Sequence, residues 1–192
     1  MLLRELDPTF TLEDARAAGL SKDQVYSMLA RDEIERVGRG VFARVGAVDP
    51  SFVALAAATA TKEEATLCLT SALVHHDLSD AIPFDSDIAL PRGMHRPSGI
   101  ANVRWHSFDP ATFQIGREAA GDEGGTSVAI YSAERSIVDS FRLMHQEGSD
   151  IAYEALRRWL RRKGSTPASL LKVAGSCPEA LPRLRHALEV LL

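Results

Sequence analysis

The chain has 192 residues, of which 45% are apolar, 25% charged and 6% aromatic, and its formal net charge is −4. These fractions are those of an ordinary globular protein, which excludes a disordered, collagen-like or coiled-coil chain. No apolar run approaches the roughly 20 residues of a membrane helix. The stretch from Met1 to Pro8 carries acids and lacks the apolar core of a signal peptide. We therefore expect a cytoplasmic protein without a membrane partner.

The cysteines and histidines show no metal-binding spacing. Cys68 and Cys177 lie far apart, which favours two buried thiols in a reducing compartment, although one disulfide stays open as an alternative. The six histidines form neither an HExxH motif nor a Cys/His pattern. We expect no metal and no cofactor.

Charge is unevenly distributed along the sequence. Residues 1–46 carry seven Lys/Arg and eight Asp/Glu, residues 47–132 five and eleven, and residues 133–192 ten and seven. A chain without an overall positive field must use local basic groups if it binds nucleic acid.

The first 46 residues have the pattern of two short helices and a hairpin. Thr11 caps a helix through Ala18, and Gly19 ends it. Ser21 and Gln24 form a capping box that starts a second helix. Two short helices joined by a glycine-containing turn are typical of a helix-turn-helix.

A hairpin is predicted directly after these helices. Residues 34–37 and 41–43 form its strands, and Gly38-Arg39-Gly40 forms its turn. Residues 1–46 are therefore predicted to be a winged helix-turn-helix that binds DNA. The candidate contacts are polar side chains of the second helix and arginines around the hairpin: Ser21, Lys22, Gln24, Tyr26, Ser27, Arg31, Arg36, Arg39 and Arg44. The alternative is an ordinary helical subdomain with a solvated loop, and nearby acids such as Asp23 and Glu35 weaken the local positive field.

Residues 9–46 resemble the N-terminal domain of AbiEi-type antitoxins. The motifs that carry this resemblance are Ala17-Ala18-Gly19-Leu20-Ser21 and Arg36-Val37-Gly38-Arg39-Gly40-Val41-Phe42. A looser similarity continues to about residue 163, through Thr70-Ser71-Ala72-Leu73, Ile88-Ala89-Leu90-Pro91 and Ser132-Ala133-Glu134-Arg135. The resemblance implies a regulator of a type IV toxin–antitoxin system whose N-terminal domain represses its own operon at operator repeats. It also implies a C-terminal domain that opposes a toxin with a nucleotidyltransferase fold, with or without direct contact.

Residues 47–192 are predicted to form an α+β domain with terminal helices. The expected helices are 49–60, 71–77, 134–144 and 152–163, a helix that begins at Thr166-Pro167, and a final helix lined by Leu184 and Leu188. The expected strands are 82–91, 103–106 and 128–131, and Gly121 to Gly125 is expected to be an exposed turn.

The predicted helix 152–163 carries a second basic group, Arg157, Arg158, Arg161, Arg162 and Lys163. These residues favour contact with DNA phosphates or an acidic partner. Electrostatic compatibility with the helix C-terminus explains them equally well.

An enzyme is the least favoured class. Asp85, Asp87 and His76 are the residues that could serve metal-dependent chemistry, but no third ligand pattern, phosphate loop or GxSxG motif accompanies them. The leading hypothesis is a sequence-specific autorepressor and antitoxin. The alternative is an interaction module that neutralises a partner through residues 47–192 without functional DNA binding.

Overall fold

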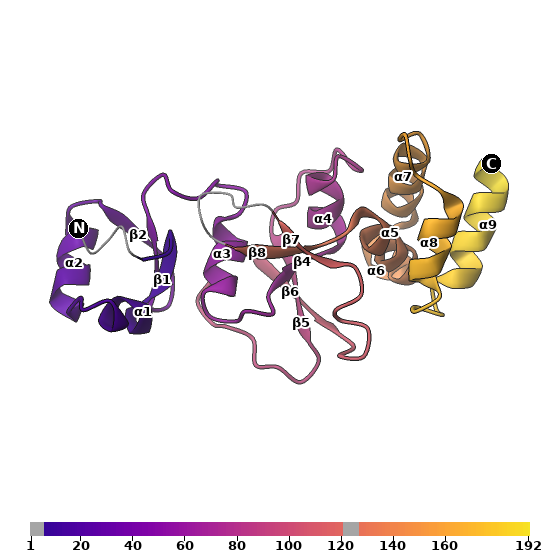
Figure 1. Cartoon of the computed structure of the whole chain (residues 1–192). Coiled ribbons are helices and arrows are strands. Elements are labelled where there is room, and N and C mark those ends of the chain that lie inside the picture. Colours follow the sequence, from indigo (N-terminus) through magenta and orange to yellow (C-terminus); the bar gives the residue numbers. More distant parts are fainter. Residues whose placement is uncertain (1–5, 121–126) are drawn as a thin grey trace.

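The computed structural model describes residues 6–120 and 127–192. In this part of the chain, two sheets and a C-terminal group of helices follow one another along the molecule (Figure 1). The fold is mixed α+β, as the sequence predicts. The turn expected at Gly121 to Gly125 lies outside the described residues.

The N-terminal unit is a three-stranded antiparallel sheet with two helices against one face. Its elements are β1 (Thr9–Thr11), α1 (Leu12–Ala17), α2 (Lys22–Ala30), β2 (Ile34–Gly38) and β3 (Val41–Arg44), and the strand order is β1-β3-β2. Phe10, Ile34 and Phe42 of the sheet meet Val25 and Met28 of α2 in a separate apolar core. The predicted helix pair and hairpin are both present, whereas the three-residue strand β1 is too short to show an alternating pattern.

Local hydrogen bonds explain where the two helices begin and end. Thr11 Oγ1 accepts from Asp14 N at 3.2 Å, and Ser21 Oγ accepts from Gln24 N at 3.2 Å. Gly19 has a φ of +86°, a conformation that lets the chain turn between the helices without a Cβ penalty. Both predicted caps are confirmed.

A five-stranded mixed sheet forms the centre of the molecule. Its order is β6-β5-β4-β8-β7, and its elements with the adjacent helices are α3 (Val53–Thr59), β4 (Thr66–Leu67), α4 (Leu69–His75), β5 (Ser86–Pro91), β6 (Val103–Phe108), β7 (Arg117–Ala120) and β8 (Val128–Tyr131). Helix α3 covers one face, where its Leu55 and Ala56 pack with Ile88, Leu90 and Ile130. The alternation along β5 sends Asp87 and Ala89 to the opposite face.

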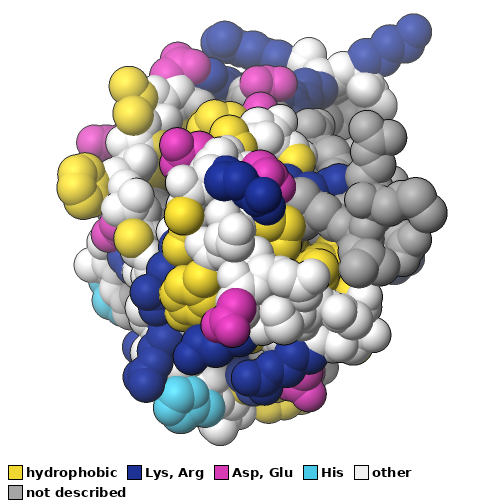
Figure 2. Space-filling model, turned by 90° about the vertical axis from the view of Figure 1, so that its left-hand side faces the viewer, with side chains coloured by type: hydrophobic (Ala, Val, Ile, Leu, Met, Phe, Trp, Pro, Cys, Tyr) yellow, Lys and Arg dark blue, Asp and Glu magenta, His cyan; other side chains and the backbone are white. Residues whose placement is uncertain are grey.

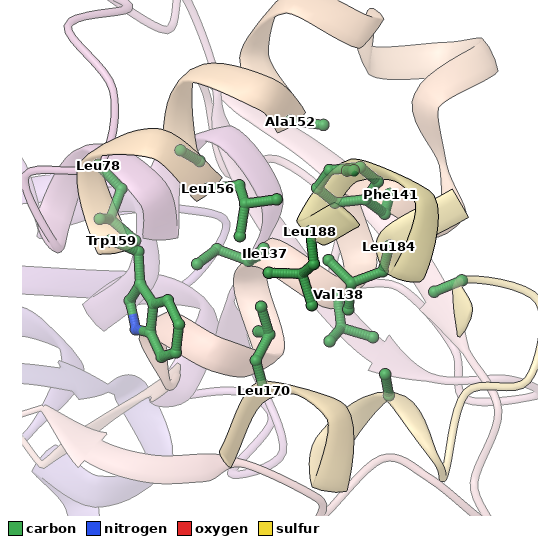
Figure 3. Close-up of a cluster of buried hydrophobic side chains, with 14 of the residues drawn as sticks. Leu78, Ile137, Val138, Phe141, Ala152, Leu156, Trp159, Leu170, Leu184 and Leu188 are labelled. Carbon is green, nitrogen blue, oxygen red and sulfur yellow. The ribbon is translucent and has the colours of Figure 1, made fainter. Parts of the chain in front are cut away.

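Helices form the C-terminal third of the molecule, and α4 packs against them. They are α5 (Ala133–Arg142), α6 (Met144–Glu147), α7 (Ser149–Leu160), α8 (Pro167–Ala174) and α9 (Leu181–Leu191). Ile137, Leu156, Leu170, Leu184 and Leu188 point toward one another in the largest apolar core (Figure 3). Thr166 caps α8 with Pro167 in its first turn, as predicted.

Several predicted boundaries are wrong for identifiable reasons. Helix α3 begins at Val53 because the Asp49 carboxylate accepts from the backbone and hydroxyl of Ser51 and holds a turn there. Strand β5 begins only at Ser86, so residues 82–85 lie before it in a loop. Helix α7 covers Ser149–Leu160 rather than 152–163, and β7, with its Glu and Ala residues, was not predicted as a strand.

Both cysteines are free and buried. Burial raises the pKa of the Cys68 and Cys177 thiols, which keeps them protonated. In the described residues no helix is long and apolar enough to cross a membrane.

Candidate nucleic-acid interface

Helix α2 has one buried and one exposed face. Val25 and Met28 are buried, and the candidate contacts in α2 and at its two caps are all exposed: Ser21, Lys22, Gln24, Tyr26, Ser27 and Arg31. The helix thus presents a row of polar side chains to solvent, which is the arrangement required of a helix that enters a DNA groove.

Two of these side chains also hold the helix start. Gln24 Oε1 accepts from Ser21 N at 2.7 Å, and Ser21 Oγ accepts from Gln24 N. The carbonyl end of Gln24 is therefore engaged, while its amide NH₂ makes no hydrogen bond within the described residues. Any base contact from Gln24 has to come from that NH₂ group.

Tyr26 connects α2 to the hairpin. Tyr26 is 43% exposed, and its ring lies edge-to-face on Phe42 of β3, with centroids 6.3 Å apart. The Lys22 ammonium lies 5.6 Å from the centre of the Tyr26 ring. Because Arg36 is the cross-strand partner of Phe42, α2 and the hairpin present Lys22, Tyr26 and Arg36 on adjoining surfaces.

The three hairpin arginines do not form one group. Arg39 is exposed in the turn, and Arg36, also exposed, donates from Nε to the Gly38 carbonyl at 3.1 Å. Arg44 pairs with Ile34 at the opposite end of the hairpin, is half-buried, and has a buried Nε without a hydrogen-bond partner in the described residues. The sequence predicts that all three arginines cluster around the hairpin. In the structure Arg36 and Arg39 lie near its turn, and Arg44 lies at its opposite end.

Acidic side chains divide the positive charge of this unit. Arg31 Nε lies 2.9 Å from Glu33 Oε1, and both side chains are exposed. On the face that the N-terminal unit presents, Lys and Arg lie at the top, in the centre and along the lower edge, with Asp and Glu scattered among them (Figure 2). The unit is suited to contacts at particular phosphates rather than to coating a polyanion.

Two residues of the second predicted basic group, Arg158 and Arg162, form contacts within the fold. Arg158 pairs with Asp80 and with Glu154, and Arg162 donates to the His76 carbonyl. These contacts fix the end of α7 to the loop after α4. Arg157, Arg161 and Lys163 remain exposed, at the end of the molecule away from α2 (Figure 1).

A buried polar network was missed by the sequence reasoning. Asp87 Oδ1 accepts from Arg104 Nε at 2.5 Å and from His106 Nε2 at 2.9 Å, and Asp87 Oδ2 accepts from the Ser71 hydroxyl at 3.4 Å. Arg104 also pairs with Glu147 at 2.8 Å. Burial opposes ionisation of Asp87, but the hydrogen bonds from His106 and Arg104 outweigh it and lower its pKa.

The residues considered for metal chemistry do not assemble a site. The Asp87 carboxylate is engaged in hydrogen bonds of this network. His76 Nε2 donates to the Tyr131 carbonyl at 2.8 Å. Asp85 lies outside β5 in the loop before it. The described residues contain no group of three or more His, Cys, Asp or Glu that could hold a metal ion.

A cleft of about 1130 Å³ lies between β2, the segment that leads into α3, α4 and the loop before β5. Its walls include Glu35 and Arg36 of β2, His75 of α4, and Phe84 and Asp85 of the loop before β5. Ile82 and Phe84 in this loop are 96% and 93% exposed, an unusual state for large apolar side chains.

Comparisons with known proteins bear on the fold and on the N-terminal unit. A crystal structure of the RV2827C protein from Mycobacterium tuberculosis is similar over 98% of this chain and 78% of that chain, with a TM-score of 0.50 and 18% identity. This likeness concerns the fold alone. The curated proteins contain no match. Residues 1–45 match the family model described as transcriptional regulator, AbiEi antitoxin, and the N-terminal unit thus carries the sequence pattern of that family.

Proposed function

We propose that this protein is a sequence-specific DNA-binding regulator that represses its own operon and acts as an antitoxin. In this proposal residues 1–46 are a winged helix-turn-helix domain and residues 47–192 an α+β antitoxin-type domain. The observation that carries it is the exposed polar face of α2 beside the Arg36–Arg39 hairpin turn, within the segment that matches the AbiEi regulator family.

The proposed docking follows from the geometry of the unit. Helix α2 enters the major groove, where Lys22, Gln24 and Ser27 meet base edges or phosphates. Arg36 and Arg39 contact the backbone from the hairpin. Tyr26 holds the two elements in register through Phe42.

Binding of the full chain to its own upstream DNA, measured against an unrelated duplex at several salt concentrations, tests this function. Each phosphate contact contributes about 0.9 to the slope of log K against log salt. Replacing Arg36 and Arg39 by Ala should therefore reduce the magnitude of this negative slope by about two. The same variant should bind both duplexes more weakly.

The matched control is K172A/R185A, which removes two exposed positive charges from α8 and α9 at the other end of the molecule. Wild-type protein without preference for its upstream DNA would overturn the proposal. Equal affinity of the Arg36/Arg39 variant and the control would overturn the role of the hairpin.

A second candidate function is neutralisation of a protein partner through residues 47–192 without functional DNA binding. The exposed Ile82 and Phe84 side chains favour this candidate, because such side chains are typical anchors of protein interfaces. The partner in this case is the nucleotidyltransferase-fold toxin that the family resemblance implies.

A further inference from the structure

The loop between β5 and β6 rests on the turn of the β2–β3 hairpin. A Cβ placed on Gly99 would lie 2.9 Å from Arg39 Cβ and 3.4 Å from Arg39 N. A Cβ placed on Gly38 would lie 3.2 Å from Ile100 Cγ1. The backbone at Gly99 and the side chain of Ile100 therefore lie directly against the hairpin, and the separation at Gly99 is one that only glycine allows.

This loop is the basic part of an otherwise acidic segment. Residues 47–132 contain five Lys/Arg and eleven Asp/Glu, yet three of those five and none of those eleven fall between residues 88 and 108. The three are Arg92, Arg96 and Arg104. Arg104 is used in the Asp87 network, so Arg92 and Arg96 supply the positive charge of the loop.

The loop holds these charges in solvent. Arg92, His95 and Arg96 are exposed, and none of them forms an ion pair with a carboxylate in the described part of the chain. Arg96 Nη2 donates to Ser107 Oγ at 3.2 Å, which ties its guanidinium to β6. Arg92 and Arg96 thus lack the carboxylate partners that Arg31 and Arg158 have.

We propose that the loop of residues 92–100, which carries Arg92 and Arg96 beside the C-terminal end of β6 and reaches the hairpin turn at Gly99, is a second surface for the phosphates of double-stranded DNA. The inference rests on the proposed function, because it extends the same interface from the N-terminal unit onto the central sheet. Figure 1 shows this loop below the sheet, and Figure 2 shows Lys, Arg and His side chains together along the lower edge of the face that the N-terminal unit presents.

The chemistry of the loop indicates backbone contact rather than base readout. Arg92 and Arg96 lie on an irregular segment that does not present a row of side chains as a helix in the major groove does. A planar guanidinium binds two phosphate oxygens at once, and this contact is the same for every sequence. The loop should therefore raise affinity and salt dependence without changing sequence preference.

The test compares the full chain with R92A/R96A in the same DNA titration. We expect the variant to bind both the upstream DNA and the unrelated duplex about tenfold more weakly, with the salt slope lower by about two. R92K/R96K keeps the charge and should bind within a few-fold of wild type, which separates lost charge from lost folding. K172A/R185A again removes two distant charges and should bind as wild type does.

A glycine pair tests the contact with the hairpin without changing any charge. Gly99 and Gly93 both have positive φ, +77° and +92°, but a Cβ at Gly93 meets nothing within 4 Å. Gly99→Ala should therefore weaken DNA binding more than Gly93→Ala, because only the former pushes the loop away from Arg39.

The outcomes separate this inference from the proposed function. If R92A/R96A binds like K172A/R185A while R36A/R39A binds weakly, the loop proposal is overturned and the function stands. If wild-type protein binds neither duplex, both are overturned. Weaker binding by R92A/R96A that the lysine variant restores supports the loop surface.

Discussion

Asp87 shows how a single residue can be mistaken for a functional group. Its place beside Asp85 suggested a carboxylate pair, yet it is fully buried and held by Arg104, His106 and Ser71. A carboxylate with its acceptor sites occupied in this way is a structural group that joins β5, β6 and α4.

Asp87→Asn should lower the free energy of unfolding at neutral pH by about 2 kcal/mol. A fully buried ion pair would lose more, but the Arg104 side chain is 48% exposed and recovers part of its solvation. Chemical denaturation of the variant and wild type at pH 7 measures the difference, and Asp77→Asn, an exposed position with left-handed φ that suits Asn equally, is the control.

The same substitution should change the response to acid. The folded-state pKa of Asp87 is below the unfolded value of about 3.9, so its contribution is present above that pH and is lost as pH falls through the folded pKa. Wild-type stability should therefore converge on that of Asp87→Asn below about pH 4. A constant difference between the two proteins from pH 7 to pH 3 would contradict this assignment.

Arg135 is a second residue whose role depends on the fold. It is 1% exposed, pairs with Asp139 at 2.8 Å and donates to the carbonyls of Thr112 and Ile115. Its guanidinium also lies 4.6 Å from the centre of the Tyr131 ring. The hydrogen bonds that Arg135 donates all go to groups inside the protein. This arginine therefore ties α5 to the loop after β6 and is not part of a binding surface.

At the scale of elements, α2 combines a structural and a proposed recognition role in one side chain. Gln24 closes the capping box with its carbonyl and leaves its NH₂ toward solvent. An alanine substitution removes both functions together, so it cannot report on DNA recognition alone.

Gln24→Glu separates the two roles. Glutamate keeps the acceptor for Ser21 N and suits the positive helix end, so the melting temperature should stay within about 2 °C of wild type. Gln24→Ala should instead destabilise by about 0.5–1 kcal/mol. The ratio of affinities for upstream DNA and the unrelated duplex should fall about fivefold in Gln24→Glu, because the substitution removes the NH₂ donor and a single hydrogen bond is worth about 0.5–1.5 kcal/mol. An unchanged ratio would remove Gln24 from base recognition.

The hairpin and the β5–β6 loop form another pair of elements. In sequence they are separated by more than fifty residues, and the approaches of Gly99 to Arg39 and of Ile100 to Gly38 show that they are in contact. The arginines at the C-terminal end of α7 illustrate the opposite case, because Arg158 and Arg162 look like a continuous basic face in sequence but bind Asp80 and the His76 carbonyl.

At the scale of the whole molecule, the described residues form four apolar cores. One lies in the N-terminal unit, one between α3 and the central sheet, one on the opposite face of that sheet around Phe108 and Tyr131, and the largest among the C-terminal helices. The exposed loop with Ile82 and Phe84 lies between α4 and β5, where Arg158 holds its start through Asp80. This arrangement leaves two apolar side chains in solvent on an anchored segment.

I82S/F84S should abolish neutralisation of a partner toxin while leaving DNA binding and stability unchanged. The side chains are almost wholly exposed, so their removal costs the fold little. Survival of cells that express the cognate toxin measures neutralisation, and Val190→Ser, at a 66% exposed position on α9, is the control. Full rescue by I82S/F84S would exclude this loop from the interface.

The sequence by itself determined the local structure of the N-terminal unit and the fold class. Caps, glycine turns and alternating strands depend on residues within a few positions of one another, which is why the caps Thr11 and Ser21 and the hairpin are predicted correctly. The predicted turn Gly38-Arg39-Gly40 is one residue too long, because Gly38 belongs to β2 and pairs with Val41. The mixed α+β class follows from the same local patterns.

Only the tertiary structure decided which charged residues remain available for binding. Arg44, Arg104, Arg158 and Arg92 have the same side chain, and the sequence around them does not distinguish their roles. Burial, pairing with Asp80 or Asp87, and the contact of Gly99 with Arg39 separate them in the folded protein. The partners lie far away in the chain, so the physical reason is that desolvation and ion pairing are set by long-range packing.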